Sequence, residues 1–267
     1  MKMDREYFLS LLNKFKSLDI KGAIDFELMN EIFISHHSTG IEGSTLTMEE
    51  TTLLIKEGIP AKGKLMVEHY MVQDHFNALD WMLTQAKEKK EVTKGLIQEL
   101  SAKVLKNTGS VINAAAGTYD SSKGEYRKSA VSVGNRYFAN YQKIEKEIDN
   151  LCKQINERLK QELSAEETYK LAFDSHFYFV TIHPFADGNG RVGRLLMNYI
   201  LEYKELPLAT IFKEDKADYF MALEESRKEE QINLKPIDDF MFSQQQKYFE
   251  QEIKKFNNQL DLDNFKL

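Results

Sequence analysis

Apolar residues recur along most of this chain at the spacing of an α-helix, about one every 3.6 residues. In segment 5–18 the apolar side chains fall on one side of a helix: Tyr7, Phe8, Leu11, Leu12, Phe15 and Leu18. The same spacing predicts further helices at 22–36, 48–57, 65–88, 92–107, 141–162, 165–181, 190–204, 215–230 and 237–257. All four prolines fall between these segments, where a missing N–H does least harm. The pattern predicts an all-α fold.

The composition is typical of a helical protein, and the net charge argues against a nucleic acid as its partner. The 267 residues include 13 glycines and 4 prolines, about half of the usual share, whereas loop-rich β folds need more turn residues. The net charge of −6 argues against a general nucleic-acid-binding surface and leaves a local phosphate pocket open. After Arg227 the sequence offers one long helix, Asp238 to Phe256, instead of a helix-turn-helix, and Gln244–Gln246 are expected to face solvent or another subunit.

The cysteine content and the lengths of the apolar runs favour a location in the cytoplasm. Cys152 is the one cysteine, so the chain forms no internal disulfide, and we interpret it as an incidental thiol. The first residues lack the apolar stretch of a secretory signal, and no segment reaches the roughly 18 apolar residues that a membrane span needs. We therefore expect a cytoplasmic protein without a membrane partner. Helices that pack within a monomer would equally pack across a two-fold axis, so a homodimer stays open.

One stretch breaks the helical rhythm. Residues 108–140 are rich in Gly, Ser, Ala, Asn and Thr, and residues 129–133 alternate small or polar with apolar side chains between Gly124 and Gly134. This alternation is typical of a short strand or hairpin. We interpret the segment as an extended flap, with a plain connector between helices as the alternative.

The residues that carry chemistry lie in one run. Residues 183–194 read HPFADGNGRVGR, between an apolar segment and a second one that is apolar on almost every face. Pro184 should end the first helix near His183, and the Asp-Gly-Asn-Gly turn should begin the second, a core helix. Backbone N–H groups in such a turn, at the positive end of a helix dipole, bind phosphate. The run therefore predicts an anion site between two core helices.

Charged side chains in the same run add to this site. Arg191 and Arg194 are one turn apart and could each donate to a phosphate oxygen. Asp187 is the kind of ligand that Mg²⁺ uses when it also binds phosphates, and His183 is a base that titrates near neutrality. Each residue alone is more often structural, but burying them together without a ligand would cost several kcal/mol.

The run resembles the signature of Fic-domain proteins, His-x-Phe-x-Asp/Glu-Gly-Asn-Gly-Arg-x-x-Arg, at every fixed position. The likeness covers about residues 30–230, and it implies a Fic-type helical bundle with a small β-hairpin flap. The flap is similar to residues 124–136, where Val131, Val133, Gly134 and Asn135 would align an extended target segment. Tyr219 looks like the family's adenosine contact, with core packing as the alternative.

The resemblance also implies a reaction. Fic proteins mostly transfer AMP from ATP to hydroxyl side chains of other proteins. His183 would take the proton from the target hydroxyl, and Asp187 would hold Mg²⁺. The α- and β-phosphates would lie on Gly188, Asn189 and Gly190, and the outer phosphates on Arg191 and Arg194. In one departure, Arg227 stands where the family often has an asparagine near the nucleotide, which leaves another base open.

A second family motif indicates that the protein inhibits its own activity. Residues 38–43 read STGIEG and are similar to the inhibitory motif of Fic proteins, in which the glutamate pairs with the second arginine of the signature. Here Glu42, with Ser38 one turn before it, would occupy Arg194 and displace the γ-phosphate, so the α-phosphorus would be presented out of line. The alternative is an ordinary glutamate in a loop.

We therefore expect N-terminal helices over 1–107 with an inhibitory segment near 36–45, a Fic core over 108–235, and a helical extension over 236–267. The expected function is an autoinhibited protein adenylyltransferase that uses ATP and Mg²⁺. The alternatives are removal of AMP, transfer of another nucleotide moiety, or a nucleotide-binding regulatory module with little turnover.

Overall fold

A computed structural model describes residues 4–18, 25–133, 136–138, 140–228 and 231–264. The chain divides into two compact units. The larger unit is Glu31–Leu208, and the smaller unit joins Met1–Asn30 to Ala209–Leu267.

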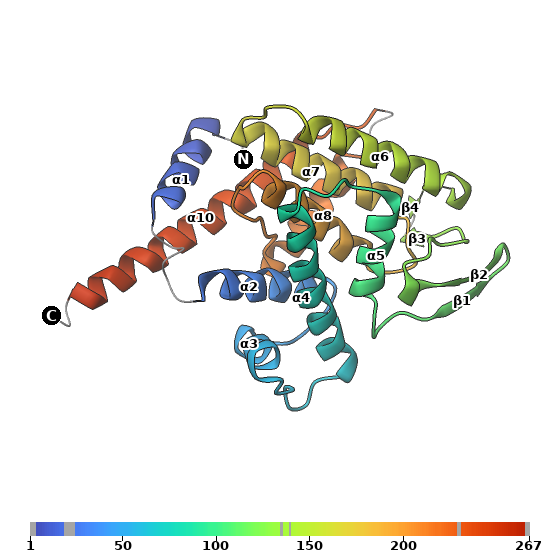
Figure 1. The fold of residues 1–267 in the computed structure, drawn as a ribbon, viewed down its shortest axis with the longest axis horizontal. Helices are drawn as coiled ribbons and strands as arrows, with labels where there is room; N and C mark the ends of the chain where they lie inside the picture. Colours follow the sequence, from blue (N-terminus) through green and yellow to red (C-terminus); the bar gives the residue numbers. More distant parts are fainter. Residues whose placement is uncertain (1–3, 19–24, 134–135, 139, 229–230, 265–267) are drawn as a thin grey trace. The chain divides into compact units, whose positions relative to one another are not determined.

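The larger unit is a bundle of helices with α8 at its centre (Figure 1). Its helices are the second part of α2 (Phe26–Ile41), then α3 (Met48–Glu57), α4 (Met66–Lys87), α5 (Lys94–Val104), α6 (Ile144–Leu159), α7 (Ala165–Ile182) and α8 (Asn189–Tyr203). Helices α7, α4 and α5 all pack against α8. As its sequence predicts, α8 is buried on every side at Leu195, Leu196, Met197, Tyr199, Ile200 and Leu201. The predicted all-α bundle is confirmed.

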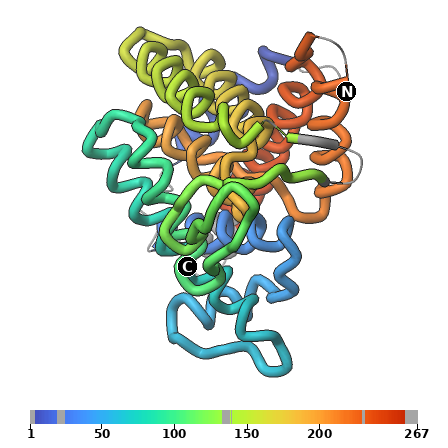
Figure 2. Tube along the Cα trace, turned by 90° about the vertical axis from the view of Figure 1, so that its right-hand side faces the viewer, coloured from blue at the N-terminus to red at the C-terminus, as the bar shows by residue number. Residues whose placement is uncertain are grey.

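Two antiparallel hairpins lie between α5 and α6. Strands β1 (Val111–Ala114) and β2 (Gly117–Asp120) form the first, and β3 (Ser132–Val133) and β4 (Arg136–Tyr137) form the second. The first projects away from the helices in Figure 1, and the same green segment faces the viewer in Figure 2. The second hairpin confirms the small β-hairpin that was predicted. The first was not predicted as a separate hairpin.

Hydrogen bonds between Ser110 and Ser121, which the sequence does not predict, hold the base of the first hairpin together. Ser121 donates its N–H to the carbonyl of Ser110 (3.0 Å), and the Ser110 N–H donates to Ser121 Oγ (2.8 Å). Next to it, Gly124 has a φ of 69° and lies against the backbone of Gln98, where a Cβ would clash. The hairpin is therefore fixed at its base by contacts within and outside it.

The helices observed follow the predicted ones closely, except that the helix predicted over 215–230 ends at Glu225 and that two others continue past their predicted ends. α2 continues to Ile41 instead of stopping near residue 36, and α10 (Lys235–Asn264) continues past its predicted end at residue 257. The last turns of α2 carry Ser, Thr and Gly, which are weak helix formers, but Ser35 through Thr39 are buried and Thr39 Oγ1 donates to the Ser35 carbonyl (2.8 Å). Packing therefore outweighs local propensity there.

The smaller unit contains α1 (Arg5–Ser17), α9 (Lys216–Glu225) and α10 (Lys235–Asn264). Helix α1 packs on α10 through aromatic rings, with the rings of Phe8 and Phe242 5.0 Å apart. Among the helices described, none is both long and apolar enough to cross a bilayer.

The expectation that Gln244–Gln246 face solvent or another subunit was wrong, because all three are buried. Gln244 accepts from the Phe212 N–H (2.9 Å) and donates to Asp215 (2.8 Å), so burial is compensated by hydrogen bonds within the unit.

Candidate active site

The expected base stands where the apolar helix α7 ends. Its last residue is Ile182, and His183 follows with φ 54° and ψ 60°, the left-handed conformation that costs a non-glycine residue about 1–2 kcal/mol. The His183 N–H donates to the Phe179 carbonyl (3.0 Å), and Pro184 prevents the helix from continuing. The predicted stop at Pro184 is therefore observed, and it places His183 at the entry of the turn.

The turn that follows is built around Asn189. Asn189 Oδ1 accepts from the Phe185 N–H and its Nδ2 donates to the Phe185 carbonyl, both at 2.9 Å, and the side chain is buried. The amide is thus engaged inside the turn, which differs from the expected contact with phosphate. Gly188, at φ 75°, precedes α8, and a Cβ added there would lie 3.3 Å from the Leu105 side chain, so a side chain would be strained. Because α8 starts at Asn189, helix geometry leaves the N–H groups of its first turn without intrahelical acceptors.

The two arginines of the run are buried beside this turn. Arg191 is 1% exposed and donates through Nη2 to Asp187 Oδ2 (3.1 Å), while its Nε and Nη1 have no partner among the described residues. Arg194 is 3% exposed, and its Nη1 likewise lacks a partner there. Buried guanidinium donors without acceptors are costly. Three such nitrogens at the positive end of a helix form a site that is complementary to a polyanion.

The other nitrogens of Arg194 are occupied by the end of α2. Nε donates to Ser38 Oγ (2.9 Å), and Nη2 donates to the Ser38 carbonyl (2.9 Å) and to Glu42 Oε1 (2.7 Å). A Cβ added to Gly190 would clash with Glu42 Oε1 and lie 2.9 Å from Arg194 Nη1. The Glu42 carboxylate therefore lies directly on the first turn of α8, where an anion would bind. The structure thus brings the two expected inhibitory residues to the expected arginine.

Asp187 is placed where one carboxylate could hold a metal ion. Its side chain is 70% exposed, Oδ1 accepts from the Gly188 N–H (2.6 Å), and Oδ2 accepts from Arg191. Within the described ranges no group of three or more His, Cys, Asp or Glu side chains is arranged to bind a metal. A lone carboxylate suits Mg²⁺, which commonly takes one or two protein carboxylates together with substrate phosphates.

The sequence analysis did not single out His75, a buried histidine that feels the charges of Arg191 and Arg194. His75 on α4 is completely buried, and its Nδ1 lies 3.1 Å from Ser35 Oγ on α2. Burial, and then the charges of Arg194 and Arg191, hold the pKa of His75 well below its usual 6.5. The residue is therefore neutral at pH 7. The signal available beforehand was weak, since a histidine on the apolar face of a helix is common.

The other predicted residues are those of the flap and Tyr219, and they do not all lie in one place. Val131 accepts the N–H of Phe138 at the end of the second hairpin (3.1 Å), and Val133 pairs with Arg136. Gly134 and Asn135 lie outside the described residues. Tyr219 is buried on α9 in the smaller unit, where it packs against Phe220 and Phe240, so its contact with adenosine stays a prediction.

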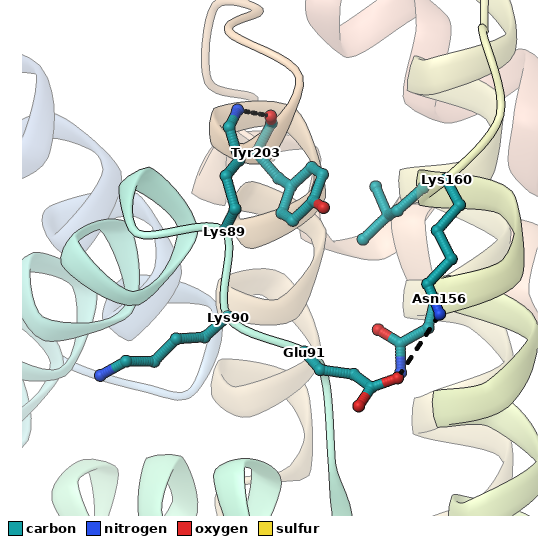
Figure 3. A pocket seen from close by; sticks show the side chains of 7 residues that line it. Lys89, Lys90, Glu91, Asn156, Lys160 and Tyr203 are labelled. Carbon is teal, nitrogen blue, oxygen red and sulfur yellow. Dashed lines mark hydrogen bonds and ion pairs between the residues drawn. The ribbon is translucent and has the colours of Figure 1, made fainter.

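A separate cavity of about 240 Å³ lies near the far end of α8 (Figure 3). Its lining includes three lysines, but Lys89 donates to the Tyr203 carbonyl and Lys160 lies 3.8 Å from Glu91. In Figure 3 the ammonium group of Lys90 points away from the other labelled side chains. Tyr203 ends α8, whose first turn is about 20 Å away along the axis. This cavity is therefore distinct from the anion site.

Comparisons with known proteins agree with this geometry. Residues 91–201 match the Fic/DOC family. A protein adenylyltransferase Fic from Nematostella vectensis is 29% identical over 211 residues, which cover 79% of this chain and 46% of the relative. A protein adenylyltransferase fic-1 from Caenorhabditis briggsae is 27% identical over 216 residues, which cover 80% and 40%. The chain spans less than half the length of these curated relatives.

Solved structures extend the agreement to the fold. A Fic-domain-containing signaling protein from Bacteroides thetaiotaomicron superposes with a TM-score of 0.78 at 25% identity, over 94% of this chain and 98% of that one. Fic-1 from C. elegans gives a TM-score of 0.73 at 21% identity over 97% and 73%. The signature run, the turn and the two arginines lie within or beside the segment, residues 91–201, that matches the Fic/DOC family.

Proposed function

We propose that this protein transfers AMP from ATP to a hydroxyl side chain of a target protein and that Glu42 restrains the reaction. The proposal is carried by the three unpartnered guanidinium nitrogens of Arg191 and Arg194, which are buried beside the first turn of α8. A triphosphate supplies the acceptors that these donors lack. The adenylyltransferase names of the relatives support the same substrate.

The reaction follows from the order of groups along the turn. The α- and β-phosphates would lie on the N–H groups that begin α8, with Asn189 holding the turn in shape. His183 would accept the proton of a Ser, Thr or Tyr hydroxyl as its oxygen attacks the α-phosphorus. The bond from the α-phosphorus to the bridging oxygen breaks, and pyrophosphate leaves. Positioning and charge stabilisation would supply most of the rate.

Asp187 would hold Mg²⁺ in this reaction. Its carboxylate is exposed beside the turn and is already oriented by Gly188 and Arg191. Bound there, Mg²⁺ would neutralise charge on the phosphates.

The second part of the proposal is autoinhibition. Arg194 can offer Nη1 and Nη2 together to a γ-phosphate only when Glu42 leaves Nη2, and Glu42 also lies against Gly190 on the anion turn. While the carboxylate stays, ATP can bind only displaced, with its α-phosphorus away from the line of attack. The partner in this reading is a protein with an acceptor hydroxyl on an extended segment, which would pair with the edge of the β3–β4 hairpin.

The test uses ATP labelled at the α-phosphate, added with Mg²⁺ to a lysate from the source organism. The Glu42→Gly protein is expected to incorporate label into target proteins and into itself, and the double variant Glu42→Gly/His183→Ala is expected to incorporate none. Mass spectrometry of a modified protein identifies the adduct as AMP or another nucleotide moiety. ATP binding without labelled product in the Glu42→Gly protein would instead favour a nucleotide-sensing module.

A further inference from the structure

The base His183 is held from two sides by the segment that carries the β3–β4 hairpin. Arg127, before the hairpin, is buried with 1% exposure, and its Nε donates to the His183 carbonyl (2.7 Å). Its own N–H donates to the Pro184 carbonyl (3.0 Å). A buried guanidinium therefore binds the backbone on which the base is mounted.

The same guanidinium also binds the approach to the hairpin. Arg127 Nη1 donates to the Ser129 carbonyl (2.7 Å), three residues before β3. Because a guanidinium is planar and rigid, donors on one group fix their acceptors relative to one another. Arg127 therefore sets the distance between the start of the hairpin and the backbone of His183. It also donates to the C-terminal end of α7, where a cation is favourable.

Phe138, after the hairpin, holds the side chain of the base. Its ring is stacked on the His183 imidazole, with centroids 3.9 Å apart and planes 24° apart. The Phe138 N–H donates to the Val131 carbonyl (3.1 Å), which continues the pairing of the two strands. One face of the imidazole is thus covered by the Phe138 ring.

We infer that Arg127 and Phe138 are positioning residues that clamp His183, the first by its carbonyl and the second by its ring. This inference rests on the proposed function, since it concerns the base of that reaction. His183 needs such support because its left-handed backbone is unfavourable on its own. Both residues belong to the segment that bears the hairpin, so a target segment that pairs with the hairpin would act on the base through these contacts.

The clamp is tested first without any reaction, by NMR of the histidine ring protons in the wild-type protein. Protons stacked over an aromatic face are shifted upfield, and the His183 signals are assigned by their loss in His183→Asn. Phe138→Leu is expected to return these signals toward the values of an exposed histidine. Phe256→Leu, which alters a half-buried phenylalanine on α10, is expected to leave them unchanged. His183 signals at ordinary values in the wild-type protein, or unmoved in Phe138→Leu, would overturn the clamp.

The second test measures AMP transfer in the Glu42→Gly background. Phe138→Leu and Arg127→Lys are each expected to lower kcat about tenfold, because the base loses its orientation while the anion turn is untouched. The Kd for a non-hydrolysable ATP analogue should stay within about twofold for the same reason. Because both residues act on one conformation of His183, the double variant should lose much less than the product of the single losses.

The outcomes separate this inference from the proposed function. An unchanged kcat, or a loss confined to ATP affinity, overturns the positioning role while the proposed function stands. If the Glu42→Gly parent transfers no nucleotide although it binds ATP, the proposed function fails, and the NMR result alone then decides whether His183 is clamped.

Discussion

The carboxylate of Glu42 and the guanidinium of Arg194 form an ion pair of 2.7 Å across 152 residues of sequence. The Arg194 side chain is only 3% exposed, and that of Glu42 is 28% exposed. Removing one partner of such a pair leaves a buried charge uncompensated. Arg194 therefore needs an anionic partner in every state of the site, and Glu42 and a phosphate are alternatives for that place.

This exchange predicts a change in stability that does not depend on turnover. Without nucleotide, Glu42→Gln should lower the free energy of unfolding by about 1–3 kcal/mol, because Arg194 loses its counter-charge. ATP with Mg²⁺ should then raise the Tm of Glu42→Gln more than that of the wild-type protein, since the phosphates restore the missing charge. The measurement is thermal unfolding with and without ATP. Equal shifts in the two proteins would show that Glu42 and the triphosphate do not compete.

Ser38 should contribute a smaller part of the same restraint. Ser38→Ala removes the acceptor for Arg194 Nε but leaves the Ser38 carbonyl and Glu42 in place. We expect a rise of up to about tenfold in AMP incorporation, since one hydrogen bond to a charged group contributes about 1.5 kcal/mol. The double variant Ser38→Ala/Glu42→Gly should be no more active than Glu42→Gly alone. If the gains in AMP incorporation from the two substitutions were additive, Ser38 would act independently of the restraint by Glu42.

The anion site could be predicted because local rules determine most of it. Pro184 ends α7 because a proline cannot continue a helix beyond its first turn, and Gly188 supplies the positive φ that starts α8. Asp187, Arg191 and Arg194 then follow from the geometry of a single turn and helix. The spacing of Arg191 and Arg194 in the sequence already places them on neighbouring positions of that helix, with Asp187 in the turn just before it.

The contacts that surround this site could not be predicted from one sequence. His75 and Arg127 reach it from α4 and from the approach to the hairpin, and only the packing of distant elements brings them there. The β1–β2 hairpin could not be predicted for a related reason. Its strands are only four residues each, and half of their residues are Asn, Ala, Gly or Asp, which strands disfavour, so its stability depends on Ser110, Ser121 and Gly124 at its base.

Asp187 gives a prediction about metal dependence. Asp187→Asn keeps an oxygen that can accept from the Gly188 N–H but removes the negative charge that would hold Mg²⁺. In the Glu42→Gly background we expect AMP transfer to fall at least about tenfold and to need more Mg²⁺ for half-maximal rate. A chelator should abolish transfer in the parent. An unchanged Mg²⁺ titration in Asp187→Asn would exclude this carboxylate as the ligand.

Two glycines in the larger unit form a matched pair for stability. Gly58 and Gly124 both have a φ of 69°, but a Cβ meets nothing within 4 Å at Gly58 and clashes with the Gln98 carbonyl at Gly124. Gly58→Ala should cost about 1 kcal/mol, from the left-handed backbone alone. Gly124→Ala should cost clearly more, because α5 and the segment before Arg127 must move apart. Urea unfolding of both variants measures the difference, and equal losses would contradict the close contact at Gly124.

His75 makes the stability of the protein depend on pH in a defined direction. Its folded-state pKa lies well below the unfolded value of about 6.5, so the unfolded chain binds the proton more readily. The stabilisation from neutral His75 is complete above pH 6.5 and is lost as the pH falls from there toward the folded pKa. The slope contributed by this group is at most about 1.4 kcal/mol per pH unit.

His75→Gln should remove that dependence, because an amide can still bond to Ser35 and does not titrate in this range. Asp74 acts in the opposite sense, since burial raises its pKa above 3.8 and the folded state takes up its proton more readily as the pH falls. The Asp74 contribution is common to both proteins and cancels in their difference. Urea unfolding at several values between about pH 5 and 7.5 therefore isolates His75. The difference in unfolding free energy between wild type and His75→Gln should shrink steadily below pH 6.5, and parallel profiles would mean that His75 does not titrate as its burial beside two arginines requires.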